Sequence, residues 1–254
     1  MDWILALAGF GVGALVGVTG VGGGSLMTPF LLVYGIPPTV AVGTDLAYAA
    51  IAKTLGVWLR HKARSIDWRA ASLLAAGSIP ASLVVVALLE HYSLRGAAFE
   101  LIITRVLAVG LILTATTLLA SRWLQRLRIG MPELPARGAV TVAVGVLLGA
   151  LVTLSSVGSG AIGTALLLMI YPRWTVGRVV GTDLAYAVPL TATAAIGHLF
   201  LGHVDFAYVA MLLVGAVPGM YLGTNLGLNL REEYVRAALG VLLLGVGVSF
   251  LGGR

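Results

Sequence analysis

Long apolar segments alternate with short polar connections along the whole chain, and this pattern predicts helices that cross a membrane. A spanning helix needs about 20 predominantly apolar residues. Most of the segments reach this length, but two of them are too short to span alone. The apolar segments are residues 3–20, 25–35, 40–59, 68–90, 97–121, 138–154, 161–171, 178–201, 204–227 and 233–252. The sequence therefore predicts an all-α, polytopic transmembrane protein.

A glycine-rich break precedes each of the two short segments, 25–35 and 161–171. The breaks lie at residues 20–25 and 155–160, and a long apolar segment precedes each of them. Interrupted hydrophobic segments at corresponding positions of two halves are typical of discontinuous helices in transporters. We therefore expect two broken or re-entrant helices, each followed by three full spans.

The two halves of the chain share sequence. The heptapeptide GTDLAYA occurs at residues 43–49 and again at 181–187, which is 138 positions later. At the same spacing Asp67 matches Asp205 and Gly77 matches Gly215, whereas matches before the inserted residues are 136 apart. We therefore divide the chain into an N-terminal transmembrane repeat (1–121), a basic connector predicted to be cytoplasmic (122–137) and a C-terminal transmembrane repeat (138–254).

The distribution of basic residues favours repeats of inverted topology. If each broken helix enters and leaves on one side, the loops 60–69, 122–137, 172–178 and 228–236 share a membrane face. That face then carries 12 basic residues, and the other face carries only Arg95 and Arg254. If each broken helix instead crosses the membrane once, the repeats are parallel. One membrane face then carries 9 basic residues and the other carries 5. Cytoplasmic loops carry an excess of Lys and Arg, which favours the inverted arrangement.

The composition agrees with an integral membrane protein and narrows its function. Of 254 residues, 59% are hydrophobic and 10% are charged, whereas soluble domains carry about 25% charged residues. No cysteine is present, so disulfides, thiolate metal sites and cysteine nucleophiles are excluded. The net charge of +6 indicates basic loops at a membrane face rather than a nucleic-acid partner. We expect a bacterial protein of the plasma or inner membrane, in contact with the lipid bilayer.

The glycine-rich breaks are candidate anion sites. Each opens a short helix, whose N-terminal amides are unpaired and carry partial positive charge. The candidate substrate-binding residues there are Gly22, Gly23, Gly24, Ser25, Ser155, Ser156, Gly158, Ser159 and Gly160. The alternative is that the glycines only allow close helix packing. No Lys-Ser/Thr follows the first glycine run, so ATP binding there is not expected.

Each heptapeptide places an acid, Asp45 or Asp183, within an apolar segment. Intramembrane carboxylates are costly and usually mark a pathway for ions or solutes, so we predict that both serve coupling to protons or sodium ions. The alternative is helix N-capping, for which Asp and the preceding Thr44 and Thr182 are suitable. These two threonines are also candidate substrate-binding residues.

Lys53 lies two turns after Asp45 on the same helix face and has no basic counterpart in the second repeat. It is a candidate substrate-binding residue that neutralises an anion or pairs with Asp45, which would leave Asp183 as the acid that titrates. The alternative is that its side chain reaches a membrane interface. His198, His203 and Asp205 suggest a metal site only weakly, because zinc sites need three or four ligands. We predict no metal, no cofactor and no enzymatic activity.

Residues 17–53, GVTGVGGGSLMTPFLLVYGIPPTVAVGTDLAYAAIAK, resemble the signature of the TauE/SafE family of sulfite exporters. The second half repeats the pattern as SSVGSG followed by VVGTDLAYA. The resemblance implies transport of small sulfur-containing anions such as sulfite and organosulfonates. Many members have GTS where this chain has GTD, and two additional acids would repel an anion unless they are protonated or neutralised by Lys53 or a cation.

These observations predict a secondary transporter, an exporter of small sulfur-containing anions that is coupled to protons or sodium. A passive anion channel and a transporter of another small anion are the alternatives. The sequence leaves the transported anion, the direction, the coupling ion and the oligomeric state open.

The predicted topology can be tested with single cysteines, because the chain has none of its own. Cysteines introduced as Arg64→Cys and Arg173→Cys should react with a membrane-impermeant maleimide from the same side. Ser93→Cys, in the loop predicted to lie on the opposite face, is the control and should react from the other side. Labelling of positions 64 and 173 from opposite sides would contradict the inverted arrangement.

Overall fold

The computed structural model describes residues 3–19, 24–62, 65–91, 97–127, 136–226 and 232–252. In these residues the protein is all-helical and has no strand. The helices are α1 (Trp3–Thr19), α2 (Gly24–Val33), α3 (Pro38–Lys62), α4 (Trp68–His91), α5 (Ala97–Leu119), α6 (Ser121–Leu127), α7 (Arg137–Ser155), α8 (Ala161–Ile170), α9 (Val176–Phe200), α10 (Phe206–Leu226) and α11 (Glu232–Leu251).

The helix bounds confirm the predicted transmembrane class. Within the described residues, six helices are long and apolar enough to cross a membrane, namely α4, α5, α7, α9, α10 and α11. The two short segments after the glycine-rich breaks form the ten-residue helices α2 and α8. Neither is long enough to span a bilayer, for which about 20 residues are needed.

The sequence did not predict α6, which begins at Ser121 and otherwise lies in the region 122–137 that was interpreted as a polar connector. The segment SRWLQRL was interpreted as part of a polar loop because it contains two arginines. It forms a helix in which apolar residues lie among the basic ones. Leu124 of this helix lines a small cavity together with Leu168 of α8, so α6 packs on the short helix of the second repeat.

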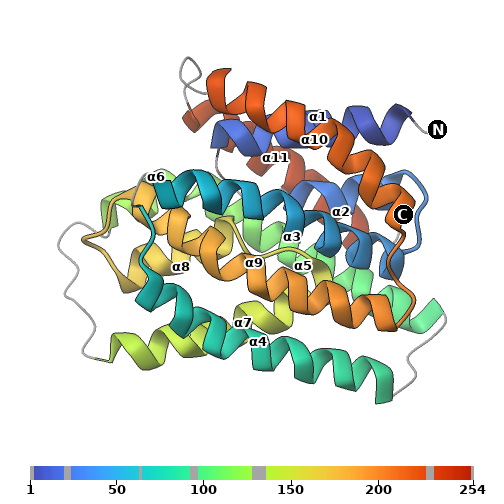
Figure 1. Cartoon of the computed structure of the whole chain (residues 1–254), viewed down its shortest axis with the longest axis horizontal. Coiled ribbons are helices and arrows are strands. Elements are labelled where there is room, and N and C mark those ends of the chain that lie inside the picture. Colours follow the sequence, from blue (N-terminus) through green and yellow to red (C-terminus); the bar gives the residue numbers. More distant parts are fainter. Residues whose placement is uncertain are drawn as a thin grey trace.

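The helices pair reciprocally between the two halves of the chain (Figure 1). At one edge of the molecule α1 (blue) lies beside α10 (orange), and at the opposite edge α7 (yellow-green) lies beside α4 (teal). Between these pairs, α3 and α9 pack on each other, and α5 packs on α11. Two repeats related by a two-fold axis would pair in this way. Their inverted orientation in a membrane stays a prediction.

Glycine allows the helices of the outer pairs to approach backbone to backbone. A Cβ added at Gly145 or Gly149 of α7 would collide with the carbonyl oxygen of Leu74 or Ser78 of α4. The α1–α10 pair repeats this arrangement at the positions that the duplication relates: Gly9 faces Leu212, and Gly13 faces Ala216. Small residues at helix contacts are the usual means of close packing in membranes.

Replacing one of these glycines by alanine should separate a helix pair. Gly149→Ala should lower the thermal unfolding midpoint of the detergent-solubilised protein, because its Cβ would meet the Ser78 carbonyl and overpacking costs about 1–3 kcal/mol. Gly245→Ala in α11 is the matched control, since an added Cβ there has no atom within 4 Å. Equal midpoints for the two variants would show that the glycine contact does not limit stability.

Candidate functional site

The two acids of the heptapeptides lie in the interior of the molecule, on the central helices α3 and α9. Asp45 is 0% exposed and Asp183 is 2% exposed. Both lie about two turns inside their helices, which begin at Pro38 and Val176. The alternative that they cap helices is therefore wrong, and Thr175 caps α9 instead by accepting from the Arg178 amide.

The break between α7 and α8 lies against these central helices. The helix α7 ends at Ser155, and Ser156 adopts a left-handed conformation with φ 57°. Gly158 and Gly160 have φ of 126° and 120°, values at which a side chain would be strained. Gly158 and Gly160 are therefore needed for the chain to pass from the end of α7 into the start of α8.

The corresponding break between α1 and α2 is only partly described. Gly22 and Gly23 lie outside the described residues, as does the remainder of segment 20–23. Gly24 begins α2, and Ser25 follows it in the first turn. Anion binding at the two breaks therefore stays a prediction.

Lys53 connects α3 to the α7–α8 break. Its side chain is 4% exposed, and its Nζ donates to the Ser159 hydroxyl at 2.6 Å. Both buried acids, Asp45 and Asp183, lie close enough to interact with this ammonium group. The alternative that Lys53 reaches a membrane interface is wrong, because its charged end lies among buried polar groups.

Asp45 is held from the short helix α2. The Thr28 hydroxyl donates to Asp45 Oδ2, while Oδ1 is buried without a hydrogen-bond partner. The hydroxyl of Ser156 in the break lies close to this carboxylate and is also unsatisfied. The carboxylate of Asp45 and a hydroxyl of the break thus lie side by side in the interior.

Asp183 lies against the short helix α8. A Cβ at Gly163 would collide with Asp183 Oδ1 and would lie 3.0 Å from the Tyr186 hydroxyl, so the glycine makes room for both groups. Asp183 Oδ1 and the Tyr186 hydroxyl are buried without hydrogen-bond partners, as is the Tyr48 hydroxyl. Buried polar groups are normally satisfied, so these oxygens are candidates for contact with a ligand.

Sequence reasoning missed Thr28, Tyr48 and Tyr186. The two tyrosines had a signal, because each follows its acid by three residues within the repeated heptapeptide and therefore shares its helix face. Thr28 had no signal, since its contact with Asp45 depends on how α2 folds back on α3.

Three of the predicted site residues, Thr44, Thr182 and Ser155, have hydroxyls that form hydrogen bonds with the protein backbone. The Thr182 hydroxyl accepts from the Asp67 amide at 3.0 Å, and the Thr44 hydroxyl accepts from the Asp205 amide at 3.1 Å. The duplication relates these two contacts, and each joins a central helix to a loop of the other half. The Ser155 hydroxyl donates to the Leu151 carbonyl at 2.7 Å. These three hydroxyls hold the backbone in place.

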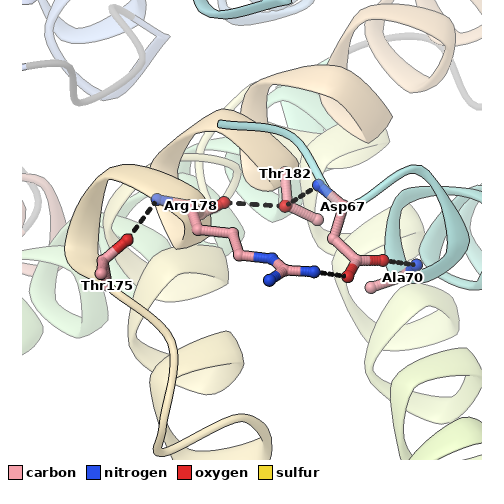
Figure 2. A network of polar contacts seen from close by, with 5 residues as sticks. All are labelled: Asp67, Ala70, Thr175, Arg178 and Thr182. Carbon is pink, nitrogen blue, oxygen red and sulfur yellow. Dashed lines mark hydrogen bonds and ion pairs between the residues drawn. The ribbon is translucent and has the colours of Figure 1, made fainter. Parts of the chain in front are cut away.

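Figure 2 shows the network that surrounds Thr182 at the start of α9. Asp67 Oδ2 forms an ion pair with Arg178 Nη2 at 2.5 Å. Its Oδ1 caps α4 by accepting a hydrogen bond from the Ala70 amide at 2.9 Å. Arg178 also lies over the ring of Trp174, 4.8 Å from its centroid. The described parts of loops 60–69 and 172–178 therefore meet at one end of the bundle.

The histidine pair at the other end of α9 has structural contacts. His198 Nε2 lies 2.9 Å from the Thr153 carbonyl oxygen, and the His198 and His203 rings are 5.6 Å apart. Asp205 caps α10 by accepting from the Ala207 amide at 2.8 Å. Within the described part of the chain, no group of three His, Asp or Glu side chains is placed to hold a metal ion.

Comparison with known proteins places this arrangement in a family. The chain is 34% identical over 255 residues to the probable membrane transporter protein YjnA of Bacillus subtilis, covering 99% of this chain and 100% of the relative. It is 26% identical to the probable membrane transporter protein YdhB of the same organism, over 95% of this chain and 99% of the relative. A probable membrane transporter protein of Methanocaldococcus jannaschii is 24% identical, over 98% of this chain and 94% of the relative.

No solved structure matches the chain. The family described as sulfite exporter TauE/SafE matches residues 5–250, which is nearly the whole chain. With its apolar spanning helices, its buried acids and these relatives, the protein is a membrane transporter, and the chain belongs to the TauE/SafE family.

Proposed function

We propose that this transporter exports a small sulfur-containing anion, such as sulfite or an organosulfonate, in a cycle coupled to protons or sodium ions. The observation that carries the proposal is a buried cation, Lys53, at the α7–α8 break between two buried acids. The substrate class comes from the family description. The hydrogen-bond donors of the site are suited to a small anion of this kind.

The donors around the break suit the oxygen atoms of such an anion. The Lys53 ammonium and the Ser159 hydroxyl already contact each other, and the hydroxyls of Ser156, Tyr48 and Tyr186 are buried nearby. The start of α8 contributes a positive helix end, where Gly160 supplies no side-chain cap. Hydrogen bonds from charged and hydroxyl donors are what a buried anion requires.

Charge balance supplies the reason for coupling. Lys53 alone cannot neutralise two ionised acids and an incoming anion, and an uncompensated charge inside a protein is costly. At least one acid must therefore bind a proton or pair with a cation while the anion is present. A passive channel has no such requirement, which separates the two functions experimentally.

The positions of the acids favour different roles for them. Because Asp45 already accepts from Thr28 of α2, we assign Asp183 as the counter-ion of Lys53 and Asp45 as the acid that binds the coupling cation. This assignment reverses the one that sequence spacing alone suggested. Thr28 holds one oxygen of Asp45 and leaves Oδ1 available for a proton or a cation.

The proposed function is tested with the purified protein in proteoliposomes. Flux is measured for sulfite, sulfate, thiosulfate and small sulfonates, with a pH gradient, with a sodium gradient and with neither. We expect sulfite or a sulfonate to be preferred, and one gradient to drive accumulation against the anion gradient. Downhill flux that neither gradient affects would identify a passive channel, and preference for an anion without sulfur would overturn the substrate class.

Removal of the buried cation should weaken anion binding. Lys53→Met should raise the KM by about 30-fold or more, since loss of one partner of a buried charge pair costs at least about 2 kcal/mol. Arg126→Gln, which changes an exposed arginine of α6, is the control and should leave KM unchanged. An unchanged KM in Lys53→Met would remove Lys53 from the site.

The two acids should differ when each is replaced by asparagine, which has the same shape but cannot ionise. Asp45→Asn should retain anion exchange and lose its response to the coupling gradient. Asp183→Asn should lose most transport, because Lys53 then lacks its counter-charge. Gel filtration of both variants checks that they are folded. If Asp183→Asn instead keeps exchange and loses the gradient response, the roles are reversed.

A further inference from the structure

A polar cavity lies outside the proposed substrate site, at the end of the bundle where α4 and α7 begin. Its volume is about 300 Å³, and it extends to the segment that joins α8 to α9. Its polar and aromatic lining is formed by Asp67, Arg69, Arg137, Gly138, Tyr171 and Trp174. None of these residues belongs to the cluster around Lys53.

The lining residues favour an anionic ligand. Two cations, Arg69 and Arg137, face the cavity together with one carboxylate, Asp67. That carboxylate already accepts from Arg178 at 2.5 Å and from the Ala70 amide at 2.9 Å, so both of its oxygens already have donors within the protein. Arginine suits phosphate oxygens because its planar group donates several hydrogen bonds.

The beginning of α7 adds backbone donors to the same cavity. Ala136 precedes this helix and provides no side-chain cap, and Gly138 of the first turn lines the cavity. The α4 helix differs, because Asp67 caps it. First-turn amides that lack a cap are donors for a phosphate group.

The surroundings of the cavity are those of a lipid headgroup. Tyr171 and Trp174 stack with their ring centroids 4.0 Å apart, and aromatic residues concentrate at the headgroup level of membranes. Trp68 at the start of α4 is 53% exposed, and large apolar side chains such as Leu83 and Leu147 are exposed farther along α4 and α7. In a spanning protein these outer surfaces contact acyl chains.

The two repeats share the helix cap beside this cavity but not its basic residues. Asp205 caps α10 as Asp67 caps α4, so the cap is kept in both halves. At the spacing of 138, however, Ala207 corresponds to Arg69, and Val40 corresponds to Arg178. The basic cavity therefore belongs to one end of the molecule, the end with the loops predicted to be cytoplasmic.

We propose that this cavity binds the phosphate of an anionic membrane lipid, with Arg69, Arg137 and the first-turn amides of α7 as donors and with the acyl chains along α4 and α7. Basic pockets between helices at the cytoplasmic side are suited to such headgroups. Since the Asp67 amide donates to Thr182, next to Asp183, a bound lipid would stabilise the junction of α4 with the central helix α9.

The experiment uses the purified full-length protein in detergent. Dioleoyl phosphatidylglycerol and dioleoyl phosphatidylcholine are titrated, and binding is followed by the thermal unfolding midpoint and by native mass spectrometry of retained lipid. Only phosphatidylglycerol should raise the midpoint and remain bound. Arg69→Gln combined with Arg137→Gln should weaken its binding by about 10- to 30-fold. Arg126→Gln, an exposed arginine of α6 that does not line the cavity, should bind like the unchanged protein.

Three results would overturn the proposal: no preference for phosphatidylglycerol, equal binding by the double variant, or equal losses in the double variant and Arg126→Gln. Inorganic phosphate and sulfite are titrated in parallel. If either gives the same saturable shift and displaces the lipid, the cavity is a site for a free anion and not for a lipid. Should the double variant fail gel filtration, the exposed Arg69→Gln alone must show an intermediate loss of lipid binding.

Discussion

The burial of three charged groups in the centre of a helical membrane protein is the constraint on which the rest of this structure depends. Lys53, Asp45 and Asp183 all lie in the interior, where an ionised group without compensation is strongly unfavourable. Thr28, Ser159 and the α7–α8 break provide part of that compensation. The proposed ligand would complete it at the oxygens of the two acids and two tyrosines that have no hydrogen-bond partner.

The glycine contacts at the edges make this interior possible. Because α1 with α10 and α4 with α7 approach at backbone distance, the central helices α3 and α9 are enclosed by tightly packed pairs. The paired contacts of Thr44 and Thr182 with opposite loops then tie each central helix to the other half of the chain. The site therefore lies between the halves, where relative movement of the halves would change it.

The sequence predicted what depends on local pattern and missed what depends on tertiary approach. The apolar segments and the glycine runs were sufficient to predict the short helices α2 and α8 and the burial of the acids. They could not distinguish a helix start from a position two turns inside, because Gly-Thr-Asp is a suitable cap wherever it occurs. They also gave no sign that the hydroxyls of Thr44 and Thr182 accept from loop amides more than 100 residues away, and the substrate-binding role of these two residues stays a prediction. The hydrogen-bond partner of Lys53 could not be predicted either, because Ser159 lies 106 positions later in the sequence.

The two heptapeptides are identical, yet their surroundings differ in charge. Thr191 stands at the position that corresponds to Lys53, and its hydroxyl donates to the Ala187 carbonyl of its own helix at 2.8 Å. The short helices differ as well, because Thr28 donates to Asp45, whereas Thr164 donates to the Gly160 carbonyl and leaves Asp183 beside Gly163. A single lysine therefore makes the surroundings of two equivalent acids unequal in charge, and the proposed division into a counter-ion and a titrating group depends on this difference.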